Sequence, residues 1–156
     1  MVLLLLALTA LVTAAVVITF TIDMQIQILA VYGLTAYDTD HTTELTFIDW
    51  GALYRGNDTR RPETTGAFYY LDNTGEGKIW LSYSINDWPS GVMLEVYVRK
   101  MGTTSFEKLN PGDVSSFYLD EGEAAEWYML VTVENDAEFG TFTPKLTWQG
   151  CDSSAG

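Results

Sequence analysis

The sequence predicts an α+β protein in which a long apolar α-helix precedes an all-β, immunoglobulin-like antiparallel sandwich. Residues 1–22 contain no charged side chain, no Gly and no Pro. After Gly33, short segments rich in β-branched and aromatic residues alternate with clusters of Gly, Asn, Asp and Pro, and no long segment keeps the helical period of 3.6 residues. We therefore expect a hydrophobic helix over 1–30, a sandwich over 31–150 and a flexible tail over 151–156.

The composition excludes several classes of function. Lys and Arg number 8 against 21 Asp and Glu, so the net charge of the 156-residue chain is −13. A protein that binds duplex nucleic acid needs a basic face, which this balance does not supply. One Cys cannot close an intrachain disulfide, and one His with one Cys cannot build the usual zinc site. We expect no nucleic-acid partner, no cofactor and no metal.

The apolar segment 1–22 must be enclosed by lipid or by other protein, because it is apolar on every side of a helix. As a helix it would be about 33 Å long, enough to cross a bilayer. Three interpretations stay open. A cleavable signal would suit Ala14 and Ala15 but lacks its cationic start, and an uncleaved anchor lacks its cationic flank. In the third, a basic leader has already been removed from a mature chain.

The third interpretation coincides with a family resemblance. The segment MVLLLLALTALVTAAVVITFTI, followed at once by a polar, β-rich region, resembles the type IV pilin superfamily, in particular archaeal pilins and archaellins. Bacterial pilins usually carry Glu at the fifth mature position, and Leu5 here departs from that pattern as the archaeal branch does. The resemblance implies a helix that lies in the membrane before assembly and packs against its copies in the filament core. The implied assembly residues are Leu3, Leu4, Leu5, Leu6, Ala7, Leu8, Ala10, Leu11, Val12, Ala14, Ala15, Val16, Val17, Ile18, Phe20 and Ile22.

The next segment, 24–32, is ambiguous. Met24, Ile26 and Ile28 alternate with two Gln as in a strand, while the preceding helix could also continue. We extend the helix to about Ala30.

The predicted strands follow in order, each rich in β-branched or aromatic residues. They are LTAY (34–37), ELTFIDW (44–50), GAFYYL (66–71), KIWLSYSI (78–85), MLEVYVRK (93–100), SSFYL (115–119), EWYMLVTVE (126–134) and FTPKLTW (142–148). The five Trp residues are predicted to anchor the core or its rim.

A second resemblance covers most of this predicted sandwich. The succession IDWG (48–51), DNTGEGKIWLSYSINDWP (72–89), LNPGD (109–113) and WYMLVTVE (127–134) resembles a recurrent small extracellular β-domain of archaea. Its motifs describe turns and strands, so the resemblance implies a surface domain and no enzymatic activity.

Acidic clusters are the first candidates for chemistry. Calcium takes six to eight oxygen ligands and usually a loop with Gly at a fixed place, a pattern that is absent here. A weak surface cation site stays open beside the simpler interpretation of solvated acidic loops. The two clusters are Asp120, Glu121, Glu123 and Glu126, and Glu134, Asp136 and Glu138.

No set of residues predicts catalysis. His41 lies among acids, but without a second His or a nearby Cys it is predicted to be a loop residue. There is no nucleophile motif of the G-x-S-x-G kind and no phosphate-binding Gly motif. Asn57, in the triplet Asn-Asp-Thr, is a candidate glycosylation site, and Cys151 is predicted to be an exposed thiol.

These observations predict a structural subunit of an extracellular, type IV pilus-like filament of identical copies, assembled through packing of the amino-terminal helix. The alternative is a membrane-anchored cell-surface module whose sandwich binds a carbohydrate or another surface partner. Most cations lie between Arg55 and Lys108, so we expect several of them to meet acids of a neighbouring subunit.

Overall fold

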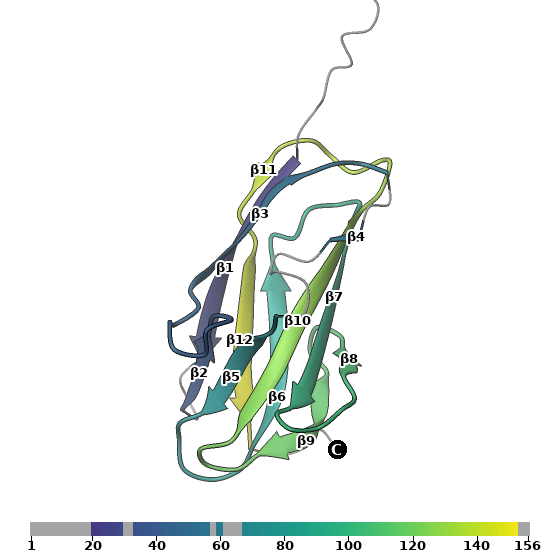
Figure 1. Ribbon diagram of the computed structural model, residues 1–156. Helices are drawn as coiled ribbons and strands as arrows, with labels where there is room; N and C mark the ends of the chain where they lie inside the picture. Colours follow the sequence, from purple (N-terminus) through teal and green to yellow (C-terminus); the bar gives the residue numbers. More distant parts are fainter. Residues whose placement is uncertain (1–19, 30–32, 57–58, 61–66, 153–156) are drawn as a thin grey trace, which may run out of the picture.

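The computed structural model describes residues 20–29, 33–56, 59–60 and 67–152, and within them the chain is all-β. Two sheets pack face to face as a sandwich (Figure 1). The strands are β1 (Phe20–Leu29), β2 (Leu34–Tyr37), β3 (Phe47–Leu53), β4 (Thr59–Arg60), β5 (Tyr69–Asn73), β6 (Ile79–Asn86), β7 (Val92–Lys100), β8 (Glu107–Leu109), β9 (Val114–Leu119), β10 (Ala124–Val133), β11 (Thr141–Phe142) and β12 (Lys145–Cys151).

The predicted α+β class with a helix over 1–30 is wrong, because the described residues contain no helix and Phe20–Leu29 forms strand β1. Ile22, Met24 and Ile26 are buried in the core, whereas Asp23 and Gln25 between them are more exposed. This period of two residues places every apolar side chain on one face of a strand, which a helix cannot do. The part of the chain that is described contains no helix of the length and hydrophobicity needed to cross a bilayer.

The predicted assembly residues divide at this strand. Those from Leu3 to Ile18 lie outside the described residues. Phe20 and Ile22 belong to β1, and the side chain of Ile22 has no exposed surface inside the sandwich. Ile22 is therefore a core residue of the β-domain and is not available to a helical filament core.

Sheet A has the order β11–β1–β12–β6–β9, with β3 also paired to β1. Strands β11 and β12 pair with β1 in one unbroken parallel register, since Thr21 lies opposite Thr141 and Gln25 lies opposite Lys145. They are in effect one strand interrupted at Pro144, whose ring nitrogen cannot donate to the ladder. The Pro144 carbonyl still accepts a 3.0 Å hydrogen bond from the Gln25 backbone N–H.

Sheet B has the order β2–β5–β10–β7–β8, and β4 also pairs with β10. Its longest pairing joins β10 to β7 in antiparallel register from Ala125–Lys100 to Val133–Val92. Burial alternates strictly along β10, so its even-numbered residues face outward.

The core lies between the two sheets and contains three of the five Trp residues, as predicted. Trp127 of β10 and Trp148 of β12 are fully buried and meet edge to face, with ring centroids 5.1 Å apart. Trp50 of β3 is also buried. None of these three indole N–H groups has an acceptor among the described residues, so the rings stabilise the fold through packing.

The edges of both sheets are interrupted. In β3 the backbone of Gly51 has a φ of 61°, and its N–H donates to Asp49 Oδ1 at 2.7 Å. At β9 the register with β6 shifts, and the Ser115 hydroxyl accepts the Leu81 N–H at 2.9 Å. A bridge at Glu44 covers part of β2. Such irregular edges do not offer a regular template to which another strand can add.

The two ends of the sandwich are distinct. Strand β1 begins at the end that carries β11, and β12 runs parallel to it and finishes at Cys151 at the opposite end, called here the distal end (Figure 1). Cys151, predicted as the first residue of a tail, is the last residue of β12.

Candidate functional site

The outer side of sheet B carries a group of rings that we call the aromatic face, made of Phe68, Tyr97, Phe106 and Tyr128. Tyr97 and Tyr128 lie directly opposite each other on β7 and β10 and stack, with centroids 4.9 Å apart and planes 9° apart. Phe106 meets Tyr128 edge to face at 4.9 Å and lies 5.1 Å from Phe68. All four side chains are half-buried, so the face is partly open to solvent.

Arg99 joins these rings to an acid. Its Nε donates to Glu126 Oε2 at 2.6 Å, and the two side chains are only 20% and 13% exposed. Its guanidinium also lies 4.3 Å from the centre of the Phe106 ring and 5.1 Å from that of Phe68. These contacts hold the charge and the rings in one arrangement.

A second ion pair lies on the same side of sheet B, next to the aromatic face. The Lys108 ammonium on β8 contacts the Glu95 carboxylate on β7. The hydrogen bond to Glu95 raises the pKa of Lys108. The acids and cations of this region are thus matched within the chain.

His41 lies in the loop between β2 and β3, as predicted, but it contacts the outer side of sheet B. Its ring stacks on Tyr70 at 3.9 Å and 5°, and its Nε2 lies 2.8 Å from Asp72 Oδ1. The spacing of Tyr70 and Asp72 on β5, which puts both on the same side of the strand, was the available signal for this contact.

The loop that carries His41 is held by Asp40. The Asp40 carboxylate accepts the Thr43 hydroxyl at 2.7 Å and the backbone N–H groups of Thr42 and Thr43 at 2.9 and 2.8 Å. The bonds from Thr43 lower the pKa of Asp40 strongly, so this acid is ionised in the folded loop. Its oxygens are engaged in turn formation, which gives His41 its left-handed backbone at a φ of 55°.

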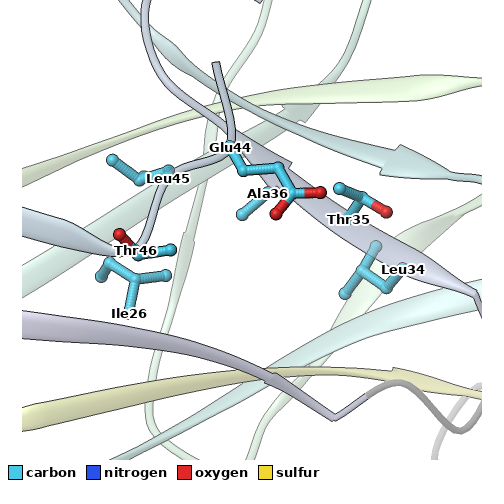
Figure 2. A pocket seen from close by; sticks show the side chains of 7 residues that line it. All are labelled: Ile26, Leu34, Thr35, Ala36, Glu44, Leu45 and Thr46. Atoms are coloured by element: carbon cyan, nitrogen blue, oxygen red, sulfur yellow. The ribbon is translucent and has the colours of Figure 1, made fainter. Parts of the chain in front are cut away.

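A cavity of about 260 Å³ opens beside β2 (Figure 2). Its apolar residues are Ile26, Leu34, Ala36 and Leu45, and its polar residues are Thr35, Glu44 and Thr46. One carboxylate and two hydroxyls fall short of the six to eight oxygens that calcium takes. This cavity offers a shallow depression with no converging set of charged groups.

A second cavity, of about 250 Å³, lies between the β7–β8 hairpin and β9, and we call it the hydroxyl pocket. Phe106 is the residue at which this pocket meets the aromatic face. Val98 and Glu107 of the pocket lie opposite each other on the inward side of sheet B, and the Phe106 ring contacts Tyr128 on the outward side. The lining residues are Val98, Lys100, Thr103, Ser105, Phe106, Glu107, Ser116 and Phe117.

The walls of the hydroxyl pocket are tied across the two sheets. Glu107 of β8 accepts the Ser116 backbone N–H at 2.9 Å and also accepts the Ser116 hydroxyl. The Thr103 hydroxyl donates to the Lys100 carbonyl at 2.7 Å. These bonds fix the carboxylate and two of the hydroxyls that line the pocket.

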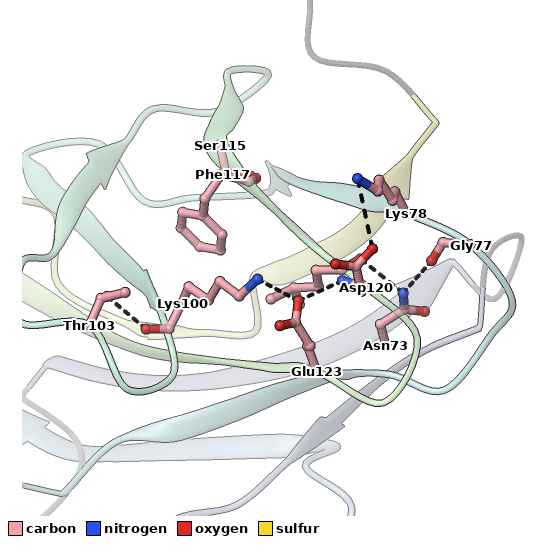
Figure 3. A network of polar contacts seen from close by, with 10 residues as sticks. Asn73, Gly77, Lys78, Lys100, Thr103, Ser115, Phe117, Asp120 and Glu123 are labelled. Carbon is pink, nitrogen blue, oxygen red and sulfur yellow. Dashed lines mark hydrogen bonds and ion pairs between the residues drawn. The ribbon is translucent and has the colours of Figure 1, made fainter.

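A polar network closes the distal end next to this pocket (Figure 3). The Lys100 ammonium lies 2.5 Å from Glu123 Oε2, which also accepts the Asp120 N–H at 2.8 Å. These two contacts, with Lys100 the larger, lower the pKa of Glu123. Lys78 lies 4.0 Å from Asp120.

Asn73 is the buried centre of the same end. Its side chain has no exposed surface, and its amide donates to the Gly77 carbonyl at 2.8 Å and to the Leu119 carbonyl at 3.1 Å. It therefore joins the end of β5 in sheet B to the end of β9 in sheet A.

The first predicted acidic cluster is dispersed by this geometry. Glu126 faces Arg99, Glu123 faces Lys100 and Asp120 faces Lys78. Over the ranges that the structure describes, no three His, Cys, Asp or Glu side chains gather as metal ligands would. The second cluster lies in the connection from β10 to β11, where Ala137 packs against Gly91.

Several of the cations expected to meet neighbouring subunits have partners inside the chain. Arg99 and Lys100 form the ion pairs described above, and Arg55 donates to the Ala137 carbonyl while lying 3.5 Å from the centre of the Phe139 ring. The expected intersubunit ion pairs stay a prediction. The Arg60 side chain, Arg61 and the candidate glycosylation site Asn57 lie outside what the structure describes.

Cys151 is a free, half-exposed thiol at the distal end. It lies opposite Trp80 in the ladder between β12 and β6, and its Sγ is 3.9 Å from Gln149 Nε2.

No protein-family model matches this chain, and a search of curated proteins finds no similar sequence. Function must therefore be inferred from the geometry and the sequence pattern.

Proposed function

We propose that this chain is a cell-surface binding module whose β-sandwich is displayed outside the cell and recognises a surface macromolecule. The observation that carries the proposal is the aromatic face of sheet B, where half-buried rings surround an ion pair at 2.6 Å. Rings that remain partly open beside satisfied charges suit recognition, since they can bury apolar area without leaving an ion unpaired.

The placement of the chain ends fits such a display. The apolar sequence 1–19 precedes β1 directly, and β1 begins at the end opposite the distal end. Attachment of this apolar sequence to a membrane would direct the distal end outward. Lys100 and the hydroxyl pocket lie toward that end, because Lys100 is the last residue of β7 and contacts the β9–β10 turn.

Surface labelling of intact cells tests the proposal. A membrane-impermeant amine reagent is expected to modify Lys78, whose side chain is 52% exposed, and mass spectrometry identifies the modified peptide. A cytoplasmic protein serves as the negative control. Labelling of Lys78 only after lysis would contradict display at the surface. Amino-terminal sequencing of the labelled material then shows whether the apolar segment is retained.

A second candidate is a structural subunit of an extracellular filament, the function first expected from the sequence. The opposite placement of β1's start and β12's end favours it, since copies could be arranged end to end. Assembly would then depend on contacts between sandwiches. Shearing cells separates the two candidates: the filament predicts sedimentable fibres, and the binding module predicts monomers after detergent extraction.

A further inference from the structure

We propose that the hydroxyl pocket and the adjoining aromatic face bind a neutral polysaccharide. This inference rests on the proposed function as a surface binding module and names the ligand class and the site.

The lining of the pocket matches the two kinds of surface on a sugar ring. Phe117 supplies an apolar ring surface, against which the C–H face of a sugar can stack, and Phe106 borders the pocket while its ring contacts Tyr128 on the outer side of sheet B. Ser105 supplies a hydroxyl that can donate one hydrogen bond and accept others. The hydroxyls of Thr103 and Ser116, whose protons are donated to the Lys100 carbonyl and to Glu107, can accept hydrogen bonds from a ligand. A ligand with hydroxyls around an apolar ring can use both sets together. The volume of about 250 Å³ limits the pocket to a small unit, such as one sugar residue.

The charges of the region favour a neutral ligand. The whole chain carries a net charge of −13, yet Arg99 is paired with Glu126 and Lys108 is paired with Glu95. Lys100, the ammonium in the pocket lining, is engaged by Glu123. A charged ligand would have to displace one of these partners, whereas a neutral one leaves the pairs intact.

The Glu107 carboxylate supports the same conclusion. Its oxygens already accept the Ser116 N–H and hydroxyl, so the acid acts as part of the wall. A cation in the pocket would compete with those two donors.

The aromatic face extends the site beyond one sugar unit. Phe106 is shared with the pocket and contacts both Tyr128 and Phe68. A polymer whose first unit fills the pocket reaches the partly exposed outer rings by passing around the β8 edge at Phe106. Arg99 fixes Phe106 and Phe68 through its position near both ring faces, so little ordering is needed when the ligand binds.

Native electrophoresis through gels that contain a polysaccharide tests the inference. The full chain is solubilised in a non-ionic detergent without a sugar headgroup and run in gels with mannan, xylan or a soluble β-glucan. Polygalacturonate gels serve as the anionic comparison. We expect retardation by at least one of the three neutral polymers and none by polygalacturonate.

Two variants locate the site. Ser105→Trp places a bulky side chain at an exposed position of the pocket lining, and Phe106→Ala removes one wall. Each is expected to weaken retardation, with an apparent Kd about tenfold higher or more. Phe47→Ala is the matched control, because Phe47 is 48% exposed on β3 of the other sheet, and it should bind as the unmodified chain does. Thermal unfolding of Ser105→Trp confirms that this variant is folded.

The outcomes separate the inference from the function on which it rests. If none of the three neutral polymers retards the chain, or if folded Ser105→Trp binds as well as the unmodified protein, the inference is overturned. Stronger retardation by polygalacturonate would also overturn it. In each case surface labelling of Lys78 on intact cells would leave the proposed display standing, whereas labelling only in lysates would reject that function regardless of the gels.

Discussion

The two sheets of this sandwich share one core but present different chemistry to solvent. Sheet A faces outward at its centre with amides and hydroxyls, among them Gln25, Ser84, Asn86 and Gln149, and its rings lie toward its edges, at Phe47 on β3 and in the Trp80–Tyr118 pair of β6 and β9. Sheet B faces outward with rings and ion pairs, as at Tyr128 and Arg99. Both alternate between buried and exposed residues. The comparison teaches that the fold constrains the inward residues of both sheets alike, while the outward residues distinguish the face suited to binding.

The largest effect should come from the core that the sheets share. Replacing Trp127 or Trp148 with Ala removes a fully buried ring, one from each sheet, and should lower the free energy of unfolding by about 3–5 kcal/mol. The double variant should lose less than the sum, because the two rings contact each other at 5.1 Å. Urea denaturation measures all three. Strict additivity would show that the edge-to-face contact does not couple the sheets.

A smaller effect is expected at the polar junction of the sheets. Asn73→Ala leaves the Gly77 and Leu119 carbonyls without this donor and should cost about 1–3 kcal/mol. Asn110→Ala is the matched control, since Asn110 is exposed, and should change stability by about 0.5 kcal/mol or less. Urea denaturation measures the stability of both variants, and equal losses would contradict a special role for the buried amide.

Substitutions on the outer faces of the two sheets should differ in their effect on stability. Arg99→Met on sheet B leaves the Glu126 carboxylate without its partner at 13% exposure and should destabilise the chain by about 1–2 kcal/mol. Gln25→Met on sheet A alters an exposed amide and should stay within about 0.5 kcal/mol of the unmodified protein. Thermal or urea unfolding of both variants compares the faces directly. A neutral Arg99→Met would remove the structural distinction between them.

The smallest effect concerns pH. Lys100 and the Asp120 N–H lower the pKa of Glu123 in the folded state, so its contribution to stability is full above the ordinary Glu pKa and is lost as pH falls through the lowered value. Because Glu123 is 36% exposed and Lys100 is 28% exposed, solvent screens this pair, and its contribution should be smaller than that of the less exposed Arg99–Glu126 pair.

Lys100→Met tests this contribution. It should be less stable than the unmodified protein at neutral pH, and the difference should narrow in acid. Lys145→Met, on the outer side of sheet A, changes the net charge equally and serves as the control. Urea midpoints of both variants are measured across the acidic range. The same dependence of the midpoint on pH in both variants would contradict the Lys100–Glu123 pairing.

Alternation in the sequence predicted the long strands well. The predicted segments at 78–85, 93–100 and 126–134 overlap β6, β7 and β10, because each has enough alternating residues to define a face. The short strands β4 and β8 were not predicted, and β11 was predicted only at Phe142, as part of the segment 142–148. Two or three residues carry no period and are defined by the strand they pair with.

The error at β1 has a different origin. The apolar sequence before Phe20 made a continuing helix plausible, although Met24 and Ile26 already alternated with Gln. The decisive information was the pairing of β1 with β3 and β12, which lie far along the chain.

The candidate site was less predictable than the fold. Arg99 and Glu126 are both visible in the sequence, but their contact depends on the register of β7 against β10. The hydroxyl pocket likewise combines the β7–β8 hairpin with β9 from the other sheet. Neither arrangement follows from local sequence patterns.

The parallel pairing of β1 with β11 and β12 has a consequence for biogenesis. A nascent chain emerges amino terminus first, so the residues of β1 appear long before Thr141 and Lys145, which complete one of its sides. Closure of so large a loop makes the final step of folding depend on contacts distant in sequence. The pairing of β1 in sheet A is therefore completed only after the last strand has been synthesised, so a chain that lacks its final residues cannot close this sheet.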